Sequence, residues 1–204
     1  SHYFGDGFAR AFDIQFTGRD NTLQYPHQTS WGMSSRIIGA IIMTHGDNNG
    51  LVLPPAVAPV QVVILPIAMH KEGVLDKAME LRDRLAATFR VKVDDSDNSA
   101  GWKFAEYEMK GVPLRLEIGP KDIANNQCVL VRRDNREKTF VSLDQLEAAI
   151  AEQLEAVRAG LYEKALARRE EMTYSAKTLE ELKDLAEHKP GSVSYTHLRA
   201  HETG

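Results

Sequence analysis

The feature that most constrains the fold is an apolar run from Val60 to Ile67. A strand without a polar face is typical of a sheet that is covered on both sides, as in α/β proteins. Residues 71–87 then show the pattern of a helix. Further strands are expected at 90–93, 114–118, 127–132 and 138–141, with a helix at 102–110 between the first two. This alternation, over about 100 residues, predicts a compact α/β domain with a mixed sheet.

Two more helices are expected after these strands. Ser142 opens the first, with a capping box to Gln145. The inner face of this helix carries apolar residues at helical spacing, namely Leu146, Ile150, Leu154, Val157 and Leu161. Thr178 and Glu181 form a second capping box. That box predicts a helix over Leu179, Leu182 and Leu185 that reaches Pro190 and Gly191.

Arg36 stands near the expected start of an apolar helix. Segments 11–16 and 23–28 favour strands that lead into a corner at Trp31 and Gly32. Ser34 or Ser35 can cap the helix, Gly46 ends it, and its apolar face comprises Ile37, Ile38, Ile41 and Ile42. A helix N-terminus attracts anions, and a guanidinium adds paired donors suited to phosphate. The pattern predicts a phosphate site at Arg36, with a solvated arginine as the alternative.

Composition limits the classes of function without choosing one. With 204 residues and 43% hydrophobic content, the chain can form one large or two modest domains. Its net charge of −4 gives no overall polybasic signal, so RNA contact would need a local patch. The single cysteine, Cys128, cannot form an internal disulfide or a cysteine zinc site by itself. The sequence has no apolar run of about 18 residues, so no membrane-spanning helix is predicted.

Both ends of the sequence are unusual. There is no initiator methionine and no signal peptide, so we expect Ser1 to be a cut end. Residues 193–203 read like a translated sequencing adapter, and we expect segment 192–204 to be disordered and exclude it from functional reasoning. His197 and His201 stand four residues apart, a spacing that can present two ligands to a metal on a helix. Two ligands are weak evidence for a metal site, and we predict none.

Several long sequence segments that match one family occur in this chain, in the same order as in that family. They are Ser1-His2-Tyr3, residues 11–16, 29–39 and 43–55, Gly101-Trp102-Lys103-Phe104, and residues 110–122. Together they resemble the prolyl-tRNA synthetases of the archaeal and eukaryotic type, a class II aminoacyl-tRNA synthetase family. The resemblance covers residues 1 to about 190. It implies the end of an antiparallel class II catalytic core at 1–57, an α/β anticodon-binding domain at 58–165, and the helical start of a truncated C-terminal domain at 166–191.

The resemblance implies ATP-dependent attachment of proline to tRNA(Pro) through prolyl-adenylate. ATP and Mg²⁺ would be bound by the complete enzyme, and the implied parent is a cytoplasmic homodimer. Arg36 corresponds to the catalytic arginine that holds ATP, together with Ser34. His2, Trp31, Gly32 and Ser35 correspond to the wall of the proline pocket. Read alone, Trp31 also suits a core position, and His2 suits a hydrogen-bonded structural role.

The same resemblance implies an anticodon site. Proline anticodons end in two guanines, whose pairing edges offer N–H donors to a carboxylate and acceptors to a cation. Glu117 and Lys121 fit these roles in residue type, with a strand-end carboxylate and a solvated lysine as the alternative reading. Trp102 and Phe104 could stack on bases, or equally pack beneath the Gly101 loop. Arg132, with Arg133, is interpreted as a contact to backbone phosphate.

Two features limit the expected activity. Residues 53–59 lack the basic residue that the family usually has in this word. The dimer motif and the motif with the second ATP-binding arginine would lie upstream of Ser1, so we expect the chain alone to be inactive. A non-catalytic tRNA-binding module is the alternative function. A ligase for threonine, glycine or histidine is a third possible function. Such a ligase should not contain segment 31–36 followed by Lys110-Gly111-Val112-Pro113.

Overall fold

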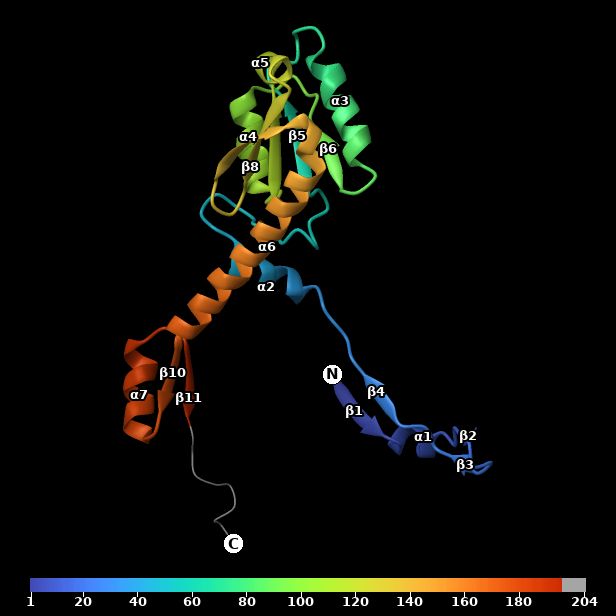
Figure 1. The fold of residues 1–204 in the computed structure, drawn as a ribbon. Coiled ribbons are helices and arrows are strands. Elements are labelled where there is room, and N and C mark those ends of the chain that lie inside the picture. Colours follow the sequence, from blue (N-terminus) through green and yellow to red (C-terminus); the bar gives the residue numbers. More distant parts are fainter. Residues whose placement is uncertain (196–204) are drawn as a thin grey trace. The chain divides into compact units, whose positions relative to one another are not determined.

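The structure is a computed structural model that describes residues 1–195, with the exception of the Tyr195 side chain. Its contacts divide the chain into two compact units, Ser1–Ile41 and a second unit that begins at Ile42. Figure 1 shows the elements of both units. The expected division into segments 1–57, 58–165, 166–191 and 192–204 stays a prediction.

A five-stranded mixed sheet forms the centre of the second unit. Its strand order is β6-β5-β7-β8-β9. The strands are β5 (Val62–Pro66), β6 (Val91–Val93), β7 (Leu114–Ile118), β8 (Gln127–Arg132) and β9 (Lys138–Ser142). β5 is parallel to β6 and β7, whereas β8 is antiparallel to both of its neighbours. This sheet confirms the expected α/β class, and all five residues of β5 are buried.

The two faces of the sheet are covered differently. Helices α3 (Val74–Leu85) and α6 (Leu146–Glu171) pack on one face and form the larger core cluster. The five residues expected on the inner face of α6 are all buried there. On the other face, α4 (Ala100–Met109) packs Tyr107 and Phe104 against alternate residues of β5, Val63 and Leu65. Phe140 of β9 is 68% exposed, so part of the sheet outside this cluster is open to solvent.

Two local expectations in this unit were wrong or incomplete. The Ser142 hydroxyl accepts from Asp144 N, and a short 3₁₀ turn, η1 (Leu143–Gln145), precedes α6. Ser142 therefore caps the turn, and no capping box to Gln145 forms. The short helix α5 (Pro120–Ala124) was not expected. Asp122 explains it, because its carboxylate accepts from Gly119 N and closes the first turn.

The end of the described chain forms a small βαβ unit. It comprises β10 (Thr173–Ala176), α7 (Leu179–His188) and β11 (Ser192–Tyr195), with the two strands parallel. The Thr178–Glu181 capping box is confirmed by reciprocal hydrogen bonds. Disorder was wrongly expected at 192–195, because backbone pairing with β10 orders these residues. His197, His201 and the rest of the excluded tail lie outside the described residues.

The first unit contains short elements only. These are β1 (His2–Gly5), α1 (Gly7–Ala11), β2 (Phe16–Thr17), β3 (Leu23–Gln24) and β4 (Gln28–Ser30). They form two small antiparallel pairs, β1 with β4 and β2 with β3. The strand expected over 11–16 was wrong, because Ile14 N donates to Ala9 O and closes a turn after α1. Residues 23–28 form only the beginning and end of the expected strand.

Helix α2 (Arg36–His45) was expected and begins at Arg36 itself. Gly46 N donates to Ile42 O at 2.8 Å, which ends the helix where the sequence indicated. The expected apolar face is exposed in part, with Ile38 60% exposed. Within residues 1–195, no helix is both long enough and apolar enough to cross a membrane.

Candidate nucleic-acid interface

Strand β7 carries its polar residues on the face opposite α3 and α6. Successive side chains of a strand point to opposite faces, so Leu114, Leu116 and Ile118 enter the core. Arg115 and Glu117 share the other face, where Arg115 Nε donates to Glu117 Oε1 at 2.8 Å. The Arg115 guanidinium also lies 4.1 Å from the centre of the Phe104 ring. Arg115 is thus held by one carboxylate and one aromatic ring.

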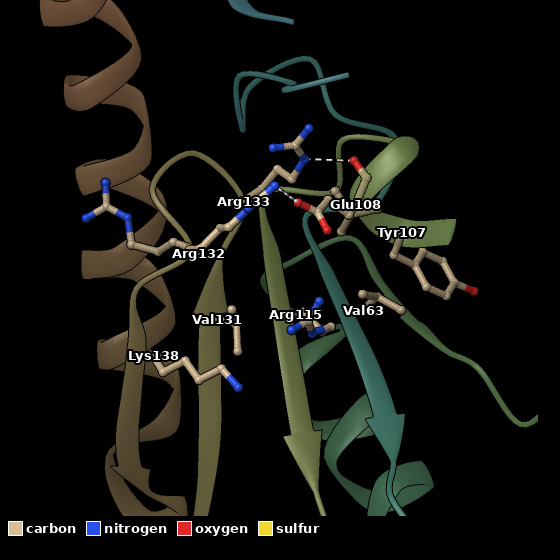
Figure 2. A pocket seen from close by; sticks show the side chains of 10 residues that line it. Val63, Tyr107, Glu108, Arg115, Val131, Arg132, Arg133 and Lys138 are labelled. Carbon is tan, nitrogen blue, oxygen red and sulfur yellow. Dashed lines mark hydrogen bonds and ion pairs between the residues drawn. The ribbon is translucent and has the colours of Figure 1, made fainter. Parts of the chain in front are cut away.

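A cavity of about 160 Å³ opens beside Arg115 (Figure 2). Its apolar lining comes from Val63, Val112 and Val131. Its charged lining comes from Arg115, Arg132, Arg133, Arg136, Lys138 and Glu108. These side chains are contributed by β7, the β8–β9 hairpin, β9 and the end of α4. We call this cavity the basic pocket.

Arg133 is buried at the edge of the basic pocket, with 5% of its surface exposed. Its Nη1 and Nη2 donate to the two carboxylate oxygens of Asp47 at 2.8 and 2.7 Å. Its Nε donates to the main-chain oxygen of Glu108 at 2.7 Å. The Arg133 hydrogen bonds lower the pKa of Asp47 to about 2. Arg133 is therefore a paired structural cation, although it comes from the same hairpin as Arg136.

Glu108 is the acidic residue in the lining of the basic pocket among the described residues. Its Oε1 is buried and accepts no hydrogen bond from any described residue. Arg136 Nη2 lies 2.6 Å from this oxygen as an ion pair without hydrogen-bond alignment, and the Arg136 side chain is 57% exposed. Arg136 also has a positive φ of 61°, which is uncommon outside glycine. Glu108 Oε1 can thus accept from a ligand if the exposed Arg136 side chain turns aside.

The pocket places hydrogen-bonding groups of both kinds around an apolar floor. Glu108 supplies an acceptor, whereas Arg115 supplies donors. Lys138 adds an exposed ammonium group at the start of β9 and has no ion pair with the residues that the structure describes. A planar polar group with donors on one edge and acceptors on another is the chemical complement of this arrangement.

Of the residues predicted to bind the anticodon, Arg132 lines this pocket, whereas Glu117, Lys121, Trp102 and Phe104 lie outside its lining. Phe104 packs against Arg115, and Glu117 accepts from the same arginine. Arg132 points away from the pocket floor toward α6 (Figure 2), where it pairs with Asp134 and donates to Ala156 O. Lys121 is exposed in α5, and Trp102 is 49% exposed in α4. Their roles in binding stay predictions.

Sequence reasoning missed Glu108, Arg115 and Lys138. They lie on three elements that are separated along the chain, and only the fold brings them to one cavity. One signal was present, because the alternation Leu-Arg-Leu-Glu-Ile in β7 places Arg115 beside Glu117 on the strand. No comparable pattern indicated Glu108 or Lys138.

The first unit places the predicted ATP and proline residues on short, exposed segments. His2 in β1 is the register partner of Ser30 in β4, and Trp31 follows directly. Trp31 is 79% exposed, so it is not a core residue of this unit. The carbonyls of Ser34 and Ser35 accept from Ile37 N and Ile38 N at 3.1 Å. Gly32 lies on the segment that joins β4 to α2, and the predicted ligand roles stay predictions.

Comparison with known proteins provides the context for the pocket. Residues 61–153 match the family model described as "Anticodon binding domain". Over 193 residues the chain is 64% identical to a proline–tRNA ligase of Ruminiclostridium cellulolyticum and 63% identical to one of Clostridium novyi. Nearly all of the chain is homologous to proline–tRNA ligases. The alignments cover 95% of this chain and 40% of each relative.

The homology confirms the resemblance that the sequence words indicated. The basic pocket lies within the region that matches the anticodon-binding family, since Glu108, Arg115 and Lys138 all fall inside 61–153. Asp47, which pairs with Arg133, lies outside that region. The archaeal and eukaryotic subtype stays a prediction.

Proposed function

We propose that the chain binds the anticodon loop of proline tRNA and that the basic pocket reads a guanine of that anticodon. The observation that carries the proposal is the position of the buried Glu108 oxygen between cations, within a region that matches an anticodon-binding family. A guanine in an open loop presents N1–H and N2–H donors and the acceptors O6 and N7. Glu108 would accept from the donor edge, whereas Arg115 and Lys138 would donate to the acceptors.

The apolar floor gives this recognition part of its strength. A base that enters the pocket leaves water and covers Val63 and Val131. Hydrogen bonds to a charged group contribute about 1.5–3 kcal/mol each when they are well formed and shielded from water. A base without the N1–H donor would leave the Glu108 carboxylate to its ion pair with Arg136 and would gain nothing from this acceptor, which is the basis of discrimination.

The homology supports a wider role in a proline–tRNA ligase. In that role the parent protein joins proline to tRNA(Pro) at the expense of ATP, through prolyl-adenylate, as a cytoplasmic homodimer. Arg36 and Ser34 would contact ATP, and His2, Trp31, Gly32 and Ser35 would line the proline site. Because the chain spans 40% of the length of its relatives, we expect it to bind RNA without catalysing the reaction alone.

Within the described residues there is no group of three or more His, Cys, Asp or Glu side chains that could hold a metal ion. We propose that Mg²⁺, like ATP, is bound by the complete ligase. Arg36, at the first position of α2, is suited to hold a phosphate group by charge and paired donors.

Binding of an anticodon stem-loop RNA to the purified chain tests the proposal. Fluorescence anisotropy would compare the wild-type chain with Glu108→Gln, which keeps the shape of the side chain and removes its charge. Glu152→Gln is the matched control, because Glu152 is exposed on α6. We expect Glu108→Gln to weaken binding about 10- to 100-fold and Glu152→Gln to have no effect. Equal binding by the two variants would reject the pocket as the guanine site.

A further inference from the structure

Asp47 contributes to the basic pocket without lining it. It lies 86 positions before Arg133 in the sequence, in the turn that follows α2, yet it holds both terminal nitrogens of that guanidinium. Asp47 also accepts from Asn49 N at 2.9 Å, which fixes its own turn. The turn thus holds the Asp47 carboxylate in position to pair with the buried Arg133.

The segment after this turn is seated on the end of α4. Leu51 N donates to Met109 O at 2.9 Å, and Leu53 N donates to Gly111 O at 3.2 Å. The backbones are so close that a Cβ on Gly50 would lie 2.5 Å from Met109 O. Met109 and Gly111 follow Glu108 closely in the sequence. The same end of α4 therefore supports residues 47–53 and carries the pocket's only lining carboxylate among the described residues.

Removal of the Asp47 charge would change the pocket through Arg133. The Arg133 side chain is 3% exposed, so it cannot exchange its partner for water without a large movement. It already donates to the main chain of Glu108, and Figure 2 shows the two residues side by side. Among the described residues, the carboxylate that lines the same cavity as Arg133 is that of Glu108, which also forms an ion pair with Arg136.

We propose that Asp47 is a positioning residue of the basic pocket: by pairing with Arg133, it keeps the Glu108 carboxylate available to the ligand. This inference rests on the proposed function, because it takes the ligand to be an anticodon guanine. It assigns a role in base recognition to a residue outside the region that matches the anticodon-binding family. A domain cut at residue 58 would lack this partner.

A double-mutant cycle separates positioning from simple structural support. Asp47→Asn leaves a buried, unpaired guanidinium, whereas the double variant Asp47→Asn/Arg133→Met removes both charges and fills the space with an apolar side chain. Replacing both partners of a buried pair is often nearly neutral for stability. The same anticodon stem-loop is the probe, and circular dichroism checks that each variant is folded. Asp83→Asn is the control, because the exposed Asp83 pairs with Arg82 on the surface of α3.

We expect Asp47→Asn to weaken RNA binding at least tenfold and the double variant to bind within threefold of wild type. Wild-type affinity in folded Asp47→Asn, or equal losses in the single and double variants, would overturn the proposal. If Asp47→Asn does not fold, Arg133→Met alone decides: threefold or smaller loss supports positioning, and abolished binding shows that Arg133 itself contacts RNA. If the wild-type chain does not bind the RNA at all, the proposed function fails before this inference is reached.

Discussion

Acid should weaken the Asp47–Arg133 pair in a defined pH window. The hydrogen bonds from Arg133 lower the pKa of Asp47 from 3.8 to about 2. A carboxylate whose pKa is lowered by folding stabilises the protein above its unfolded pKa. That contribution is lost as the pH falls through the folded pKa. The window is therefore pH 4 to 2.

The pKa difference sets the expected size of the effect. A pKa lowered from 3.8 to about 2 corresponds to roughly 2 kcal/mol in the free energy of unfolding. The Asp47 side chain is 32% exposed, so screening by solvent reduces the expected value to about 1–2 kcal/mol. Asp47→Asn lacks the titrating group and should not show this loss.

Urea unfolding at pH 6, 4 and 2.5, followed by circular dichroism, measures the effect. The free energy of unfolding of the wild type should exceed that of Asp47→Asn most at pH 6, and the difference should shrink by about 1–2 kcal/mol toward pH 2.5. Asp83→Asn should show no such trend, because Asp83 is exposed. A difference that stays constant across this range would refute the assignment of the pair as charged and stabilising.

Three further changes test other parts of the structure. Gly111→Ala should destabilise the chain by about 1–3 kcal/mol in urea unfolding, because Gly111 has a φ of +71° and a Cβ there would lie 2.6 Å from Leu51 C; an unchanged midpoint would contradict this. Thr178→Ala removes the α7 cap and should cost about 1 kcal/mol, seen as faster amide exchange in α7 but not in α3. Cys128 is fully buried, and burial raises its thiol pKa to about 12, so a thiol reagent at pH 8 should modify it only in urea; rapid reaction with the folded chain would contradict the core position.

The core of the α/β domain could be predicted because its pattern is local. The spacing of Leu146, Ile150 and Leu154 determines one helical face whatever the partner is. The apolar run that forms β5 has no polar side, so it is stable where both sides of the strand are buried. The Thr178–Glu181 box likewise depends on residues within one helical turn.

The predictions at Ser142 and at residues 11–16 were wrong because the structure there depends on contacts that are not local in the sequence. Ser142 has the sequence of a capping residue, but the chain takes a 3₁₀ turn first, and tertiary packing of Leu143 in the core decides between the two. The strand expected at 11–16 had favourable residue types, yet a turn bond to buried Ala9 prevails. Such choices depend on neighbours that are distant in sequence.

Some residues of the candidate sites could be predicted from local sequence, whereas others depend on distant parts of the chain. Arg36 was correctly expected at a helix start, because one turn of sequence is enough to indicate it. The basic pocket needs β7, the β8–β9 hairpin and the end of α4 together. Its acceptor, Glu108, further depends on Asp47, which pairs with Arg133 across 86 positions. No local pattern contains that information.

The most direct test of the central claim is the affinity of the wild-type chain for two anticodon stem-loop RNAs that differ only in the anticodon. One carries the two guanines of proline tRNA, and the other carries adenines at the same positions. We expect the guanine RNA to bind at least tenfold more tightly, because adenine lacks the N1–H donor and the O6 acceptor that complement Glu108 and Arg115. Equal affinities would show that the pocket does not read the anticodon.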